Sequence, residues 1–166
     1  MIDQNSTKAQ VLEAVTQSGF ALQYAFEDLR ADKGFVLEAV TQSGFALRFA
    51  SEELRGDREV VLTAVKQEGW ALAYASEQLQ GDRDVVMAAV KQDGYALRWA
   101  SAKLKGDKNV VLEAVRGNGH SLEFASHAMR DDEDVVMAAS SQCREAVKYA
   151  SARINRNTIQ KLWVKK

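Results

Sequence analysis

The 166-residue chain combines 46% hydrophobic with 27% charged residues, a balance typical of folded globular proteins that excludes a largely disordered chain. Its formal net charge of -1 gives no general attraction to nucleic acid or to an anionic membrane surface. The only cysteine, Cys143, excludes an intramolecular disulfide, so the protein does not require an oxidising compartment.

We expect neither a secretory signal peptide nor a membrane-spanning segment in this sequence. The first ten residues lack the basic start and the apolar stretch of a secretory signal peptide. No apolar run approaches the roughly 20 residues needed to span a bilayer. We therefore expect a cytoplasmic protein that makes no contact with a membrane.

A repeat of 25 residues runs along the chain. It is visible in a valine followed by leucine or methionine at Val11-Leu12, Val36-Leu37, Val61-Leu62, Val86-Met87, Val111-Leu112 and Val136-Met137. The same step relates the leucines at Leu22, Leu47, Leu72, Leu97 and Leu122, with Val147 in the last copy. Such regularity is typical of solenoids. The sequence predicts one repeat domain over residues 1–156, with six copies at about 7–31, 32–56, 57–81, 82–106, 107–131 and 132–156.

Each copy is predicted to form two short helices joined by a turn. An aspartate (Asp32, Asp57, Asp82, Asp107 or Asp132) stands where it can cap the first helix, and Thr7 takes this place in the first copy. In the second copy the first helix is expected from about Lys33 to Gln42, with Gly44 as the left-handed residue that ends it. The second helix is expected from about Phe45 to Arg55. The absence of proline favours helix throughout, because proline removes a backbone donor.

These helices are too short to be stable alone. A helix of about ten residues is marginal in water, so each must be enclosed by its partner and by neighbouring copies. With packed helices about 8–10 Å apart, six copies would form a rod or shallow arc of roughly 50–60 Å. The tail at residues 157–166 restarts the pattern and is predicted to be a C-terminal capping helix. The predicted fold class is therefore all-α, an α-solenoid of six tandem helix-turn-helix repeats.

The repeats carry the pattern D-[KR]-x-V-V-[LM]-x-A-V-x-Q-x-G-[aromatic]-A-L-x-[aromatic]-A-S, which Asp57–Ser76 and Asp82–Ser101 match best. This pattern resembles the repeats of the domain-of-unknown-function 4116 family over nearly the whole chain. The first and last copies depart from it at Phe26 and Arg144, which stand in place of serine and glycine. The resemblance implies a helical repeat fold and brings no active-site residues with it.

Residues with catalytic or metal-binding chemistry are sparse. His120 and His127, the only histidines, lie two turns apart on one predicted helix, about 10.5 Å along its axis, too far to share a metal by themselves. Cys143 has no base near it in sequence. The acidic run from Asp131 to Asp134 lacks the alternating ligands of a calcium loop and fits helix capping instead. We therefore expect no enzyme activity, no cofactor and no metal.

Two columns of side chains are candidates for binding a partner. The first is the aromatic at the start of the second helix, where packing between repeats is favoured and a contact surface is the alternative; its members are Phe20, Phe45, Trp70, Tyr95 and His120. The second is the basic column Lys66, Lys91 and Arg116 on the outer side of the first helix, which is either a solvated face or a central patch for an acidic partner. The candidate partner-binding residues are Phe45, Trp70, Tyr95, Lys66, Lys91 and Arg116.

A further basic column follows the capping aspartates, at Lys8, Lys33, Arg58, Arg83 and Lys108. Positive charge is unfavourable at a helix N-terminus, so we expect these residues to form a surface ladder of ion pairs with aspartates such as Asp57 and Asp82. The favoured function is a non-catalytic scaffold that binds another protein, since solenoids offer extended surfaces. A partner with an acidic patch is one alternative, which would suit the central basic column. The alternative is nucleic-acid binding along a basic face, against which the charge balance argues.

Overall fold

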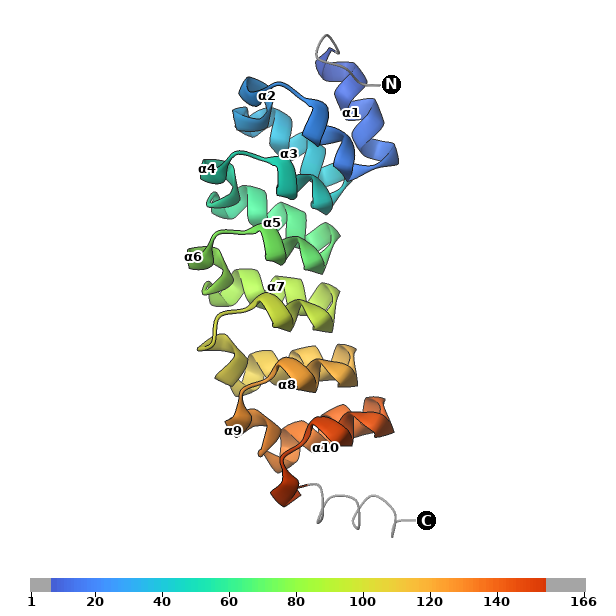
Figure 1. Cartoon of the computed structure of the whole chain (residues 1–166), viewed down its shortest axis with the longest axis vertical. Helices are drawn as coiled ribbons and strands as arrows, with labels where there is room; N and C mark the ends of the chain where they lie inside the picture. The colour runs from blue at the N-terminus through green and yellow to red at the C-terminus, as the bar shows by residue number, and fades with distance from the viewer. Residues whose placement is uncertain (1–6, 155–166) are drawn as a thin grey trace.

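The computed structural model describes residues 7–154, and within this range the chain forms helices and no strand. The long helices of successive repeats pack side by side across the long axis of the molecule, and the short helices line one edge (Figure 1). The predicted all-α solenoid is thereby confirmed. The predicted capping helix at residues 157–166 lies outside the described residues.

Each repeat opens with an α-helix of 10 residues, and in the second copy this helix spans the predicted residues 33–42. The six helices are α1 (Lys8–Gln17), α3 (Lys33–Gln42), α5 (Arg58–Gln67), α7 (Arg83–Gln92), α8 (Lys108–Gly117) and α10 (Glu133–Gln142). The predicted caps are present. In α5 the Asp57 carboxylate accepts hydrogen bonds from the backbone N–H groups of Glu59 and Val60, and in α1 Thr7 and Gln10 form a capping box.

The prediction of one continuous second helix in each copy is wrong. In the second copy it is a 3-10 helix, η2 (Gly44–Phe49), followed by extended backbone at Ala50 and Ser51 and then by the one-turn helix α4 (Glu52–Arg55). The other 3-10 helices are η1 (Gly19–Tyr24), η3 (Gly69–Tyr74), η4 (Gly94–Trp99), η6 (Gly119–Phe124) and η7 (Arg144–Tyr149). The short helices are α2 (Glu27–Ala31), α6 (Glu77–Gln80) and α9 (His127–Arg130), with the 3-10 turn η5 (Leu104–Gly106) in the fourth copy.

A serine explains the break. The Ser51 hydroxyl accepts a hydrogen bond from the backbone N–H of Leu54 and so caps a new helix. The backbone N–H of Ser51 in turn donates to the carbonyl oxygen of Arg30 in the preceding repeat, at 2.8 Å. The same backbone bond recurs from Ser76, Ser101, Ser126 and Ser151 to the preceding copy. The extended residue therefore joins successive repeats, which a continuous helix could not do because its N–H groups would be used internally.

The recurring glycine has a different role from the predicted one. No glycine between residues 7 and 154 has a positive φ, so Gly44 is not the left-handed end of a helix. It is required because neighbouring repeats approach closely. A Cβ atom on Gly69 would lie 2.6 Å from the carbonyl oxygen of Ala89 in the next repeat, and one on Gly44 would overlap the carbonyl oxygen of Ala64. Backbone thus packs against backbone at these junctions.

The hydrophobic core runs without interruption through all the repeats. Its largest fully buried side chains include the leucines at Leu22, Leu47, Leu72, Leu97 and Leu122. Val61, Val65 and Ala71 in the third repeat are likewise 0% exposed. No repeat encloses its own core, because the long helix of one copy packs against both the long helix and the 3-10 helix of its neighbours.

Replacing a core leucine should damage the solenoid far more than replacing an outward-facing residue. Leu72→Ala leaves a cavity and should lower the free energy of unfolding by about 2–5 kcal/mol. Thr63→Ala changes a half-buried side chain of the neighbouring helix α5 that hydrogen-bonds only within its own helix, and it should change this free energy by no more than about 0.5 kcal/mol. Urea titration followed by circular dichroism measures both values, and equal losses would contradict the observed facing of α5.

The glycine junction can be tested with a matched pair of substitutions. Gly69→Ala should be destabilising by about 1–3 kcal/mol, since the added methyl group collides with the Ala89 carbonyl. Gly106→Ala is the control, because the nearest atom to its added Cβ, the Ser126 Oγ, is 3.6 Å away. Thermal unfolding of both variants checks this. If Gly69→Ala were as stable as Gly106→Ala, close backbone packing would not be the reason for glycine here.

Candidate functional site

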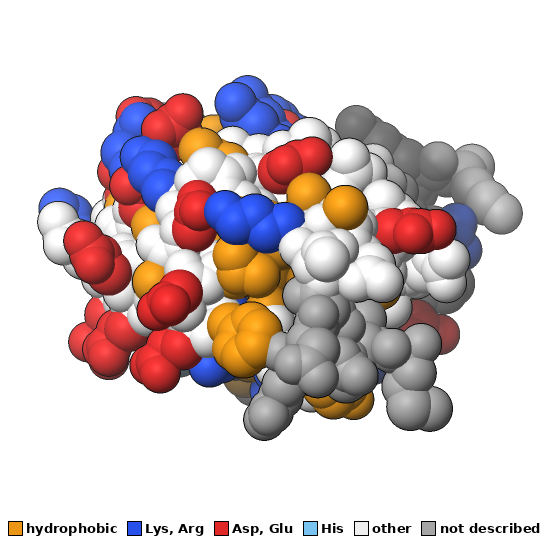
Figure 2. Space-filling model, turned by 90° about the horizontal axis from the view of Figure 1, so that it is seen from above, with side chains coloured by type: hydrophobic (Ala, Val, Ile, Leu, Met, Phe, Trp, Pro, Cys, Tyr) orange, Lys and Arg blue, Asp and Glu red, His pale blue; other side chains and the backbone are white. Residues whose placement is uncertain are grey.

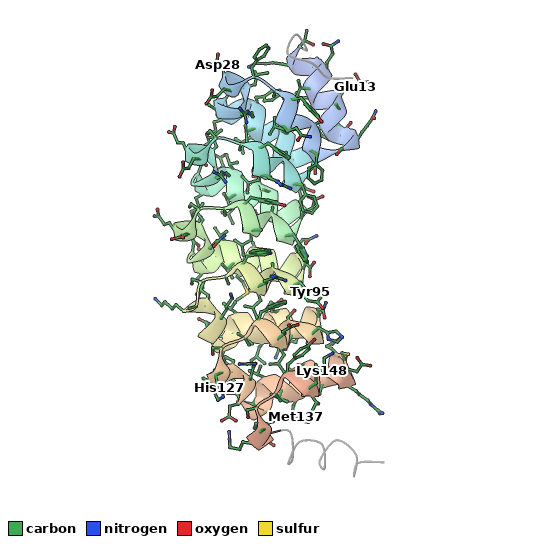
Figure 3. All side chains as sticks on the ribbon, in the orientation of Figure 1. Glu13, Asp28, Tyr95, His127, Met137 and Lys148 are labelled. Carbon is green, nitrogen blue, oxygen red and sulfur yellow. The ribbon has the colours of Figure 1, made fainter. Side chains whose placement is uncertain are left out.

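The predicted aromatic column lies along one edge of the solenoid, where each long helix passes into a 3-10 helix. We call this the turn edge. Tyr95 lies on it, opposite the edge that carries Asp28 and His127 (Figure 3). Phe45 and Tyr95 are half-buried, and Trp70 is 40% exposed. The structure therefore places the three aromatic candidates in one row that is open to solvent in part.

Two pairs of neighbouring rings in this row contact each other across the repeats. Phe20 stacks on Phe45 with ring centroids 6.3 Å apart, and Trp70 lies 6.4 Å from Tyr95. The Trp70 indole N–H donates to a carboxylate oxygen of Asp93 in the next repeat, at 2.7 Å. This bond fixes the indole and leaves part of its apolar surface exposed. The row thus joins repeats and still offers ring surface to a partner.

The predicted basic column Lys66, Lys91 and Arg116 lies at the same edge, in the last turn of α5, α7 and α8. Positive charge is favourable at a helix C-terminus. All three side chains are exposed, and none of them forms an ion pair or hydrogen bond with another residue between 7 and 154. Each stands four residues before the aromatic position of its own repeat.

The other basic column is paired, which confirms the predicted ladder. Lys33 lies 2.8 Å from Asp57, and Arg58 lies 3.0 Å from Asp82, each bridging two successive repeats. The remaining rungs join Lys8 to Asp32, Arg83 to Asp107 and Lys108 to Asp132. One oxygen of each bridged aspartate caps its own helix while the other accepts from the preceding repeat, as at Asp57. These bridges neutralise the charge of this column.

The ladder shifts the titration of its carboxylates. The hydrogen bond from Lys33 is the main reason that the pKa of Asp57 lies below its ordinary value, and partial burial opposes this effect. For Asp82, partial burial raises the pKa, but the hydrogen bonds from Arg58 and from the helix backbone outweigh it. Both aspartates are therefore ionised more readily in the folded chain than in the unfolded one.

The structure brings together two residues that are far apart in sequence. The Cys143 sulfur lies 3.3 Å from Nε2 of His120, 23 residues earlier, because both belong to the turn edge of adjacent repeats. A thiol beside an imidazole is the minimal arrangement of a cysteine nucleophile. Within the described residues no carboxylate orients the His120 ring, which instead packs against Tyr149 with centroids 6.0 Å apart. The 25-residue repeat could have revealed this proximity, since positions 23 residues apart recur as contacts, for example Trp70 with Asp93.

A second surface was missed in the sequence. It is formed by the 3-10 helices, and we call it the 3-10 face. Arg48 and Arg98 lie over aromatic rings there, Arg48 at 5.5 Å from the Phe49 ring centroid and Arg98 at 5.3 Å from that of Trp99. Three arginines in the last turn of the short helices have a buried Nε atom without a hydrogen-bond partner among the described residues. They are Arg30, Arg55 and Arg130. The available signal was the recurrence of a basic residue at two slots of the repeat, at Arg48, Arg98 and Lys148 in alternate copies and at Arg30, Arg55, Lys105 and Arg130.

A pocket of about 320 Å³ opens where the second and third repeats meet on this face. It is lined by Glu52, Arg55, Tyr74, Ala75, Ser76 and Glu77. Two carboxylates beside one guanidinium make its lining overall acidic. Such a pocket does not favour an anion.

The part of the chain between residues 7 and 154 contains no group of three histidine, cysteine, aspartate or glutamate side chains that could hold a metal ion. None of its helices has the length and apolarity required to cross a bilayer. Seen from the N-terminal end, several acidic side chains gather on one side of the surface, and basic and apolar side chains lie beside them (Figure 2). This view shows no continuous basic field.

The fold and its surfaces define a tandem helical-repeat protein. The model of the family described as a domain of unknown function (DUF4116) matches residues 9–55, 57–105 and 107–155. The chain therefore belongs to this family, as the repeat pattern indicated. Each matched segment covers two of the structural repeats, so the unit of the family is a pair of copies. No curated protein and no solved structure matches the chain.

The aspartate ladder predicts a loss of stability in acid. Because the pKa of Asp57 is lowered by folding, its stabilising effect is complete above the unfolded value near 3.8 and disappears as the pH falls through the folded value. Asp57→Asn should therefore destabilise the chain at pH 7 and lose less stability than the unchanged chain between pH 5 and about 2. Thermal unfolding across this pH range is the measurement. Glu53→Gln is the control, because it also removes one negative charge. Glu53 is exposed and has no ion pair among the described residues.

Proposed function

We propose that the protein is a non-catalytic scaffold that binds another protein along the turn edge. One observation carries this proposal. Lys66, Lys91 and Arg116 are exposed and have no counterion between residues 7 and 154, whereas the basic column at the start of the helices is paired rung by rung. Beside them lie Trp70 and Tyr95, large rings that are partly exposed.

This combination suits a protein partner with an acidic patch. Aromatic side chains anchored by their neighbours make good interface anchors, because little rotamer freedom is lost on binding. The unpaired charges attract an acidic surface and increase the rate of association. Tyr95 and Lys91 come from adjacent segments of one repeat, so a single partner can contact both.

Nucleic acid fits this edge less well. The basic column occupies only the three central repeats, because Thr16, Thr41 and Ser141 stand in the same position elsewhere. The formal net charge of -1 adds no long-range attraction for a polyanion. A short acidic patch on a protein matches the extent of this column better than a continuous phosphate backbone.

Absence of catalysis is part of the proposal. The nearest approach to a catalytic group is the Cys143–His120 pair, whose imidazole is packed against Tyr149. We therefore expect partner binding to survive replacement of both residues, and also of His127.

Variants of the turn edge test the proposal. Proteins captured from a cell extract by the unchanged chain are identified, purified and titrated against each variant. Trp70→Ala with Tyr95→Ala should weaken binding at least about tenfold, since two central anchors are lost. Reversal of Lys66, Lys91 and Arg116 to glutamate should mainly slow association and reduce its salt dependence. His120→Ala with Cys143→Ser is the control that should leave affinity unchanged.

Binding to random single- and double-stranded nucleic acid is measured in parallel, from about 50 to 200 mM salt. Micromolar affinity for nucleic acid that falls steeply with salt would contradict the proposed protein scaffold and would indicate a nucleic-acid-binding protein. Absence of nucleic-acid binding at low salt would support the scaffold.

A further inference from the structure

Arg98 and Lys105 form a cationic cluster on the 3-10 face, where the fourth repeat meets the fifth. The Arg98 guanidinium lies 5.3 Å from the Trp99 ring centroid and 5.7 Å from that of Phe124 in the next repeat. Lys105 is half-buried, and its burial together with the nearby charge of Arg98 lowers the pKa of its ammonium group. Neither side chain has an ion pair or hydrogen bond within residues 7–154.

Further donors on this part of the face are unsatisfied. The Trp99 indole nitrogen and the Arg130 Nε are buried and have no hydrogen-bond partner among the described residues. Buried donors without acceptors are costly, and two cations beside each other repel. A ligand group that brings negative charge and several acceptors would relieve both effects.

The junction between the second and third repeats differs in charge from the junction between the fourth and fifth. There Glu52 and Glu77 line the pocket beside Arg55. In the fourth and fifth repeats the same positions hold Ala102 and His127. The two carboxylates that offset the cation at the earlier junction are thus missing at the later one.

We propose that Arg98 and Lys105, with the Trp99 and Phe124 rings, bind the carboxylates of an extended acidic segment of a partner protein. The inference rests on the proposed role as a protein-binding scaffold, but it assigns a different surface from the turn edge. A carboxylate accepts from a guanidinium in a planar, two-bond geometry, while the rings contact the apolar part of the segment.

The distribution of charge favours a short peptide over a nucleic acid. The short-helix edge of the first three repeats carries Glu27, Glu52 and Glu77, which would repel a phosphate backbone that followed the whole face. Equivalent positions in the following repeats hold Ala102, His127 and Ala152, so this series of carboxylates ends after the third repeat.

The repeat also predicts the spacing of the acidic residues in the segment. Packed helices lie about 8–10 Å apart. A segment in the extended polyproline II conformation advances about 3.1 Å per residue and brings every third side chain to the same face. One repeat therefore corresponds to about three residues of the ligand. Glutamates at every third position would present their carboxylates in register with Lys105 and with Arg130 one repeat later.

A peptide of about nine residues, with glutamate at every third position between glycine and serine, is the probe. It carries a fluorescent label, and binding to the full chain is followed by fluorescence anisotropy. The same peptide with glutamine for glutamate tests the need for charge, and a thymidine oligonucleotide of equal length tests the alternative polyanion. The unchanged chain should bind the glutamate peptide and discriminate against both others.

The chain itself supplies tolerated replacements for the decisive variant. Arg98→Ala with Lys105→Gln introduces the residues that the third repeat has at these positions, Ala73 and Gln80, so folding should be retained. Peptide affinity should fall at least about tenfold. Ala102→Glu with His127→Glu should have the same effect without removing a cation, because it restores the carboxylates of the earlier junction. Glu52→Ala with Glu77→His is the matched control and should not weaken binding.

Circular dichroism confirms that each variant is folded before its affinity is interpreted. Equal binding of the glutamate and glutamine peptides, unchanged affinity of Arg98→Ala with Lys105→Gln, or tighter binding of the oligonucleotide would each overturn the inference. If only reversal of Lys66, Lys91 and Arg116 abolished peptide binding, the carboxylates would bind at the turn edge, and the proposed function would stand without this second surface. If the turn-edge variants left partner capture intact while peptide binding still required Arg98 and Lys105, the turn-edge proposal would be wrong and the proposal for the 3-10 face would stand.

Discussion

The close approach of a glycine in one repeat to an alanine carbonyl oxygen in the next sets the spacing of this solenoid. Gly44, Gly69, Gly94 and Gly119 each lie where a Cβ atom would collide with the backbone of the following copy. At such short range the two backbones have one relative position, and the long helices on either side are held in a fixed register. The 25-residue period without insertion keeps each of these glycines opposite the same carbonyl oxygen of the next copy.

Other interactions repeat because this register repeats. From the second copy onward, the serine at the break donates its backbone N–H to the previous repeat, and the capping aspartate accepts from the basic residue of the previous repeat. Each such ion pair is individually weak at the surface. Their combined value lies in satisfying polar groups at every junction, so that an extended stack of ten-residue helices remains stable although no single helix would be.

The copies differ from one another mainly in their surface side chains. At the turn edge the same slot holds threonine in the first two copies and lysine or arginine in the next three. At the short-helix edge glutamate gives way to alanine and histidine in the second half of the chain. Neither change alters the packing, because these side chains lie outside the core. A solenoid can therefore vary its surface copy by copy while the glycine and leucine positions stay constant through the first five copies, and both proposed binding surfaces lie at such variable positions.

The sequence by itself determined the all-α solenoid, the ten-residue helices, their aspartate caps and the ion-pair ladder. These follow from local patterns, namely apolar periodicity, a capping residue and a strict 25-residue step. It did not reveal that the second helix is broken at Ser51, because the break depends on a carbonyl of the preceding repeat that attracts the serine N–H. It assigned Gly44 to the wrong cause for the same reason, since a collision with Ala64 is visible only once neighbouring copies are packed. The pairing of Cys143 with His120 and the cluster of Arg98 with Lys105 also needed the tertiary structure: a repeat pattern states which residues occupy equivalent slots, but the distance between slots of adjacent copies is decided by how closely their backbones can pack.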